Sequence, residues 1–159
     1  MILNRQRRIR IPMEELRKFL SRAERQLRLP ADSVTVCLVT DAEIAHWNRA
    51  YRRKLGATDV LSFSTRAEPG GRAGQRRSAN TLPRAFLPSR DASESYWGDI
   101  AIAPAVAQRN ARRLGRKLRD ELCTLILHGL LHLMGYDHET DTGQMDRRER
   151  QLRQTLGLA

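Results

Sequence analysis

Residues 117–138 of the chain read KLRDELCTLILHGLLHLMGYDH, and this stretch decides the fold. Its middle part, LCTLILHGLLHLM, is apolar on every side of a helix, which is typical of a helix buried at the centre of a domain. Gly135 follows it and can adopt the left-handed conformation that ends many helices. We therefore predict a central buried helix over about residues 117–134, with a turn directly after it.

Three of the four histidines in the chain lie in this stretch. His128 and His132 are four residues apart, so on a helix their rings point the same way, about 6 Å apart along the axis. After the turn, His138 can reach the same point in space. Three neutral imidazoles leave the fourth position of a tetrahedral zinc ion open to water, which is the arrangement of a catalytic site. The alternative is a closed structural site with Asp137 or Cys123 as the fourth ligand.

The histidine spacing equals the metzincin zinc pattern H-E-x-x-H-x-x-G-x-x-H with one departure. Gly129 stands where that pattern has the glutamate that deprotonates the attacking water. The missing carboxylate argues against a peptidase of the usual kind, although a metal-bound water with a pKa near 7 can still supply hydroxide. We expect the glycine to leave room at the site for a bulky substrate group.

The net charge of +11 comes almost entirely from arginine, since the lysines are Lys18, Lys54 and Lys117. The charge is also clustered, because residues 109–119 contain six basic side chains and no acidic one. Arginine matches phosphate geometry and stacks on bases, which predicts a polyanionic partner such as RNA. The alternatives are an arginine-rich surface that is merely solvated and an anionic membrane surface, for which no basic segment has a suitable apolar face.

Around the central helix, the sequence predicts further elements of both kinds. Helices are expected over residues 12–29, from the capping box at 40–43 to about 51, over 104–113 and over 142–156. Strands are expected over residues 1–11, 33–40, 59–65 and 98–103. About four strands and five helices therefore make up a single domain that spans residues 1–159.

Residues 66–95 differ from the rest of the chain. They are rich in glycine, proline, serine, alanine and arginine and show little periodicity. We predict a flexible insertion within the domain rather than a linker between two domains.

Other features bear on the compartment. Cys37 and Cys123 lie in apolar runs and are expected to be buried, reduced thiols. No apolar run approaches the roughly 20 residues that span a bilayer, and the first residues lack the apolar core of a signal peptide. A cytoplasmic protein without a membrane partner is the expectation.

Three blocks of the sequence resemble one family. The run HGLLHLMGYDH at 128–138 closely resembles the zinc-site signature of the YbeY family of bacterial endoribonucleases. The runs NRAYRRK at 48–54 and TDVLSF at 58–63 are similar to a second family block, and GDI at 98–100 resembles a third. The blocks come in family order and cover most of the chain. Two departures are Leu55, where the family usually has an acidic residue, and the length of residues 66–95.

The resemblance implies a fold and a function. The fold is a small α+β domain with helices around a mixed sheet. The function is a metal-dependent, single-strand-specific endoribonuclease that acts in ribosomal RNA maturation, notably near the small-subunit rRNA 3′ end, and in ribosome quality control. Its partners are then single-stranded RNA and ribosomal particles. The resemblance also implies one zinc ion on His128, His132 and His138, and a functional arginine, matching Arg52, in a basic groove beside the metal.

Individual roles follow as hypotheses. Arg52 is predicted to be catalytic by pairing with the scissile or a neighbouring phosphate and stabilising transition-state charge. The alternatives are an ordinary surface arginine and a phosphate-positioning contact. RNA contacts are also predicted for Lys54, Arg112 and Arg113. Asp137 either holds a ligand histidine in its metal-binding tautomer or caps the turn after the helix.

Two other functions stay open at the level of the sequence. A metalloprotease or another zinc hydrolase fits the histidine pattern but not Gly129 or the charge. A non-catalytic ribosome assembly factor with a structural zinc ion fits the charge but not the open coordination position. Three imidazoles suit zinc, and nickel, copper or iron can bind the same ligands.

Overall fold

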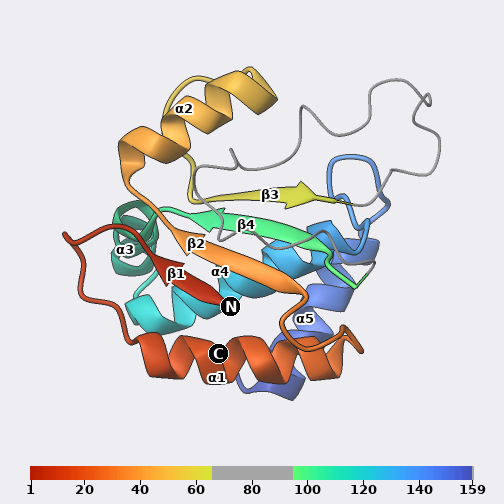
Figure 1. Cartoon of the computed structure of the whole chain (residues 1–159). Coiled ribbons are helices and arrows are strands. Elements are labelled where there is room, and N and C mark those ends of the chain that lie inside the picture. Colours follow the sequence, from red (N-terminus) through yellow and green to blue (C-terminus); the bar gives the residue numbers. More distant parts are fainter. Residues whose placement is uncertain (66–94, 159) are drawn as a thin grey trace.

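A computed structural model describes residues 1–65 and 95–158 (Figure 1). The elements in this part of the chain are β1 (Ile2–Asn4), α1 (Met13–Gln26), β2 (Val34–Leu38), α2 (Asp41–Arg52), β3 (Val60–Ser64), β4 (Gly98–Ile102), α3 (Pro104–Arg113), α4 (Leu118–Leu133) and α5 (Gln144–Leu156). The expected four strands and five helices of an α+β domain are thus confirmed. The insertion predicted at 66–95 lies almost wholly outside the described residues.

The strands form one mixed sheet in the order β1-β2-β4-β3. Strands β1, β2 and β4 are parallel, and β3 pairs with β4 in the antiparallel sense at the edge. Figure 1 shows α1, α4 and α5 on one side of the sheet and α2 on the other. Since side chains alternate across a strand, each face of the sheet contributes to its own core.

The larger core lies between the sheet and the helices α1, α4 and α5. Helix α4 is buried on nearly all sides, as its apolar sequence predicts. It ends before Gly135, whose φ of 91° confirms the left-handed turn. The smaller core lies on the opposite face, where Trp47 of α2 packs edge-on against Phe63 of β3. Helix α4 is therefore a rigid support on which a site can be built.

Two local predictions need correction at the N-terminal end. The strand expected over residues 1–11 is only three residues long, because Gln6 turns the chain. Its side chain accepts from the N–H of Ile9 and donates to the C=O of Ile9. Pro12 is the residue before α1 rather than its first helical residue. The capping box of α2 is confirmed, with Thr40 Oγ1 accepting from the Glu43 N–H at 3.2 Å and Glu43 Oε2 accepting from the Thr40 N–H at 2.9 Å.

The remaining features are the two cysteines and the length of the apolar helices. Both Cys37 and Cys123 are buried and free, as expected. Within residues 1–65 and 95–158, no helix has the length and apolar character needed to cross a membrane.

Candidate metal centre

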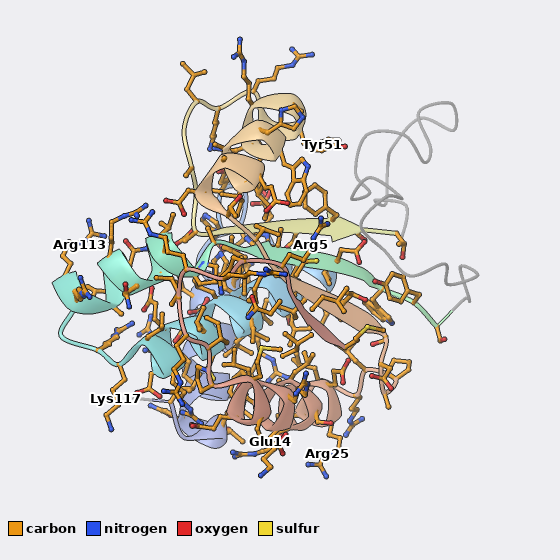
Figure 2. All side chains as sticks on the ribbon, turned by 60° about the vertical axis from the view of Figure 1, so that its left-hand side comes forward. Arg5, Glu14, Arg25, Tyr51, Arg113 and Lys117 are labelled. Carbon is orange, nitrogen blue, oxygen red and sulfur yellow. The ribbon has the colours of Figure 1, made fainter. Side chains whose placement is uncertain are left out.

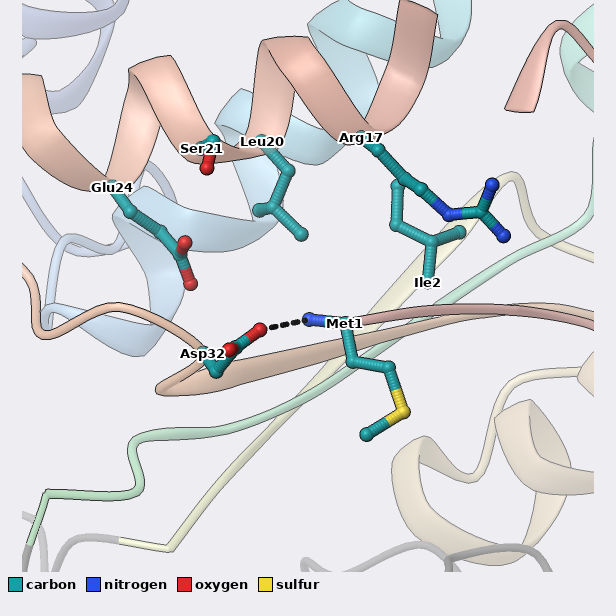
Figure 3. Close-up of a pocket in the computed structure, with 7 residues that line it drawn as sticks. All are labelled: Met1, Ile2, Arg17, Leu20, Ser21, Glu24 and Asp32. Carbon is teal, nitrogen blue, oxygen red and sulfur yellow. Dashed lines mark ion pairs between the residues drawn. The ribbon is translucent and has the colours of Figure 1, made fainter. Parts of the chain in front are cut away.

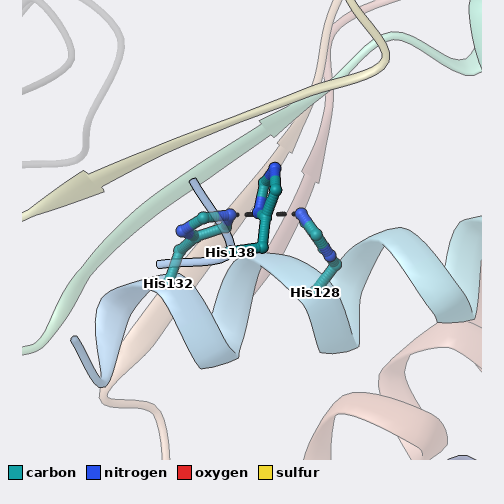
Figure 4. A group of neighbouring side chains, drawn as sticks. All are labelled: His128, His132 and His138. Carbon is teal, nitrogen blue, oxygen red and sulfur yellow. Dashed lines mark hydrogen bonds between the residues drawn. The ribbon is translucent and has the colours of Figure 1, made fainter. Parts of the chain in front are cut away.

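The three predicted histidines come together in the structure. His128 and His132 project from α4, and His138 returns to them after the turn at Gly135 (Figure 4). The Nε2 atoms of His128 and His132 are 3.1 Å apart, and the possible ligand nitrogens of the three rings all lie within 4.8 Å of one another. His128 and His132 are half-buried, whereas His138 is exposed. The group therefore opens to solvent on the side of His138.

This donor set fits a tetrahedral metal ion. Ligand nitrogens at about 2.0–2.1 Å from a zinc ion are separated from one another by about 3.3 Å. The pair on α4 already has nearly this spacing, and the widest gap in the group needs to close by only about 1.5 Å. Among the described residues, no Cys, Asp or Glu joins the group as a fourth ligand, which leaves one position for water or substrate.

The electrostatics of the group also suit metal binding. The pKa of His132 is lowered to about 4, first because the ring is buried and then because His128 and His138 are close. Arg52 adds a smaller lowering of the same pKa. His132 is therefore neutral at physiological pH, and a neutral imidazole is the form that binds a metal.

Helix α5 contributes a residue that sequence reasoning missed. Glu149 Oε2 lies 2.9 Å from Nδ1 of His128, the ring nitrogen that faces away from His132. The sequence pattern of α5 could have indicated Glu149. Glu149 falls between Met145 and Leu152 at helical spacing, so an acidic residue occupies a position on the buried face of α5.

Asp137 makes the contacts of a turn cap. Its Oδ1 accepts from the N–H of Glu139 at 3.0 Å, and its Oδ2 accepts from Thr140 Oγ1 at 3.1 Å. The first of these bonds is the main reason that the pKa of Asp137 is lowered. Of the two roles considered for Asp137, capping matches these hydrogen bonds, and the carboxylate in contact with a histidine ring is Glu149.

Gly129 does not leave room for a substrate, and this expectation was wrong. A Cβ atom at this position would lie 2.7 Å from Cγ2 and 2.9 Å from Cδ1 of Ile100. Gly129 therefore faces β4, and its carbonyl oxygen accepts a 3.3 Å hydrogen bond from Ser62 of β3. The glycine lets α4 approach the sheet closely, and the position has no space for the glutamate of the metzincin pattern.

Two predicted RNA-contacting residues lie beside the histidine turn. Arg52 Nη2 and Lys54 Nζ approach the same oxygen, Oε1 of Glu139, at 3.4 Å and 3.6 Å. All three side chains are exposed, so these ion pairs contribute little to stability. The ion pairs instead fix where the two basic side chains lie. Because Glu139 directly follows His138 in the chain, they hold Arg52 and Lys54 beside the histidine group. Two cations thus stand at the open side of the histidine group.

The segment after α2 is shaped by Asn48, whose role sequence reasoning missed. Its buried side chain donates a 3.0 Å hydrogen bond to the carbonyl oxygen of Gly56, and its own carbonyl accepts from the Lys54 N–H. Arg53 ends α2 with a φ of 53°, which turns the chain there. These contacts fold residues 53–56 back so that Arg52 and Lys54 reach the same acceptor.

The other predicted RNA contacts lie elsewhere. Arg112 and Arg113 end α3, and Figure 2 shows Arg113 and Lys117 at the outer surface near the start of α4. This start is 14 residues before His132, or roughly 21 Å along the helix. An RNA contact there stays a prediction.

A pocket between α1 and the beginning of β1 also lies away from the histidines (Figure 3). It is lined by Arg17, Glu24 and Asp32 among others, and the Met1 ammonium pairs with Asp32 at 3.6 Å. No residue of α4 or of the turn after it lines this pocket. The histidine group therefore remains the candidate site for chemistry.

Comparison with known proteins decides the family. A family model described as Endoribonuclease YbeY matches residues 1–157. The chain belongs to the YbeY family of endoribonucleases. A YbeY endoribonuclease of Koribacter versatilis is 35% identical over 99% of this chain and 86% of its own length. One from Nautilia profundicola is 37% identical over 79% of this chain and 73% of its own length.

The fold of this chain is similar to that of a protein whose structure has been solved. A solution structure of a protein from Thermotoga maritima matches with a TM-score of 0.55 and 23% identity, over 98% of this chain and 89% of that one. The YbeY family and the histidine group together make this protein a metal-dependent endoribonuclease, as the resemblance implied.

Proposed function

We propose that this YbeY protein binds zinc through His128, His132 and His138 and cleaves single-stranded RNA in the cytoplasm. Its targets are ribosomal RNA, notably near the small-subunit rRNA 3′ end, and ribosomal particles under quality control. The observation that carries the zinc site is the spacing of the three imidazoles with an open fourth position. The family match supports RNA as the substrate.

The chemistry follows from the donor set and its surroundings. A zinc ion bound there supplies Lewis-acid chemistry, because it activates water near neutral pH and polarises a phosphoryl oxygen. The protein's part is to hold the three rings converging and to keep the ring of His132 neutral, which its burial favours. The exposed side at His138 admits a phosphodiester from solvent.

Arg52 and Lys54 are proposed to bind the phosphate. Both approach one carboxylate oxygen of Glu139, so their charges already converge on a single anionic group beside His138. A phosphate offers more acceptor oxygens than a carboxylate and forms stronger, charge-assisted hydrogen bonds with arginine. An RNA phosphate can displace the exposed Glu139 at low cost, since exposed ion pairs are weak. Arg52 then stabilises charge in the transition state.

The experiment measures cleavage of a fluorescent single-stranded RNA by the purified protein. It is run beside His132→Ala and beside a chelated sample that is then refilled with zinc. We expect cleavage to require both His132 and metal and to return on refilling. If all samples cleave alike, the activity comes from a contaminating nuclease.

A non-catalytic assembly factor gives a different result. In that case the wild-type protein still binds RNA but never cleaves it, and metal removal unfolds the domain. For a catalytic site, chelation removes activity while far-UV circular dichroism stays largely unchanged. The peptidase alternative is disfavoured by Gly129, which is packed against Ile100 and has no room for a general-base glutamate.

A further inference from the structure

Helix α5 has an acidic residue on its buried face. Met145, Leu152 and Leu156 are buried and point toward the core, at the spacing of one stripe along a helix. Glu149 falls in this stripe, and its side chain is only 17% exposed. A carboxylate in such a position costs free energy unless it is paired. The fold alone therefore favours an apolar residue here.

The partner of Glu149 explains its presence. Its Oε2 lies 2.9 Å from Nδ1 of His128, and it has no other polar contact within residues 1–65 and 95–158. A carboxylate accepts a hydrogen bond, so it favours the tautomer with the proton on Nδ1 of His128. The lone pair then lies on Nε2, which faces His132 and the centre of the histidine group at 3.1 Å.

We propose that Glu149 is a positioning residue of the metal centre, which fixes the tautomer and the ring orientation of His128. This inference rests on the zinc site of the proposed function. It makes α5 a functional part of that site, although no α5 residue lies in the histidine stretch. Carboxylates that hold a metal-binding histidine in this way typically contribute a 10- to 100-fold gain in metal affinity.

The test compares zinc affinities of the full chain by competition with a chelator of known affinity. Glu149→Leu completes the apolar stripe of α5, so it keeps or improves the packing while it removes the acceptor. We expect it to weaken zinc binding by about 10- to 100-fold. Glu149→Gln keeps a carbonyl oxygen that can accept from Nδ1–H, so its loss should be smaller. Asp146→Leu, an exposed acid on the same helix, has the same charge change and should bind zinc like the wild type.

Two readouts separate positioning from a structural role. Thermal unfolding in the presence of chelator should show Glu149→Leu at least as stable as the wild type. Nitrogen NMR of the chelated proteins should show His128 protonated at Nδ1 in the wild type and a mixture of tautomers in Glu149→Leu. A merely structural carboxylate predicts the opposite, a less stable protein with an unchanged tautomer.

Each outcome bears on one claim. The inference is overturned if Glu149→Leu binds zinc as tightly as the wild type, or if its affinity falls only together with its thermal stability. If the wild type binds zinc and Glu149→Leu does not, yet neither cleaves RNA, the positioning role stands and the proposed function fails. If Glu149→Leu keeps full affinity while the wild type cleaves RNA, the proposed function stands and the inference fails.

Discussion

Gly129 lets the helix that carries the histidines pack closely against the sheet. It brings α4 so close to β4 that a methyl group at its position would overlap the side chain of Ile100. The same position holds the general base in peptidases with this histidine spacing. The close approach of helix and sheet and a carboxylate at this position therefore exclude one another. Any general base in the reaction has to come from water or from another residue.

Gly129→Ala should destabilise the protein by up to about 2 kcal/mol. Overpacking against Ile100 costs about 1–3 kcal/mol, and the better helix propensity of alanine returns only part of it. In an Ile100→Ala background the overlap is gone, so the same substitution should be neutral or stabilising. Urea unfolding of the four proteins in a double-mutant cycle checks this. Equal costs of Gly129→Ala in both backgrounds would contradict the packing account.

Residues of the site differ in how far the sequence could reveal them. The three histidines were predicted because their distance along the chain fixes their geometry on a helix and across one turn. Glu149 was missed because its partner lies 21 residues away, and only the packing of α5 on α4 brings them together. Gly129 was misjudged for a related reason, since a helical position alone does not tell which face meets the sheet.

At the scale of elements, the end of α2 places Arg52 at the site, and the turn that follows directs the neighbouring Arg53 elsewhere. Arg52 and Arg53 are adjacent, and both are exposed. Arg52 contacts Glu139, whereas Arg53 turns the chain with a left-handed φ and has no contact with that carboxylate. Asn48 holds the segment through its bond to Gly56. Replacing Arg52 or Arg53 by alanine removes the same charge, but only Arg52 contacts the site, so the two variants form a matched pair.

We expect Arg52→Ala to lower kcat for RNA cleavage by roughly 10²- to 10³-fold, the usual effect of removing a donor to transition-state charge. Arg53→Ala should cleave RNA at nearly the wild-type rate. Both variants should bind zinc equally well, because neither residue is a ligand. Single-turnover cleavage, with zinc affinity measured in parallel, checks the pair. An equal loss in both variants would mean that only net charge matters.

Element bounds were predicted well where the pattern is local. The capping box of α2, the proline that starts α3 and the glycine after α4 all follow from a few adjacent residues. The strand order was not accessible in this way. Pairing of β2 with β4, and of β3 with β4 in the opposite sense, depends on contacts between segments far apart in the chain. The short β1 depends on the turn made by Gln6.

For the molecule as a whole, a buried acid of β4 makes the stability depend on pH. Asp99 of β4 is fully buried, and burial raises its pKa to about 6 although the Tyr96 hydroxyl donates to its Oδ1 at 2.5 Å. Its Oδ2 is buried and has no hydrogen-bond partner within the described residues. The folded state therefore favours the protonated form.

The sign of the pH dependence follows from this raised pKa. The carboxyl of an unfolded chain titrates near pH 3.9, so between about pH 4 and 6 the folded protein holds the proton that the unfolded chain has lost. The contribution to stability is complete below this interval and is lost as the pH rises through it. Two pKa units correspond to about 3 kcal/mol. Asp99→Asn removes the titration and keeps an acceptor for Tyr96.

We therefore expect the free energy of unfolding of Asp99→Asn, relative to the wild type, to rise by about 3 kcal/mol between pH 4 and pH 7. Urea unfolding of both proteins with chelator present measures this difference, and the other titrating groups cancel because the two chains share them. Removing the metal excludes the pH dependence of zinc binding. A difference that stays constant with pH would show that Asp99 titrates alike in the folded and unfolded states.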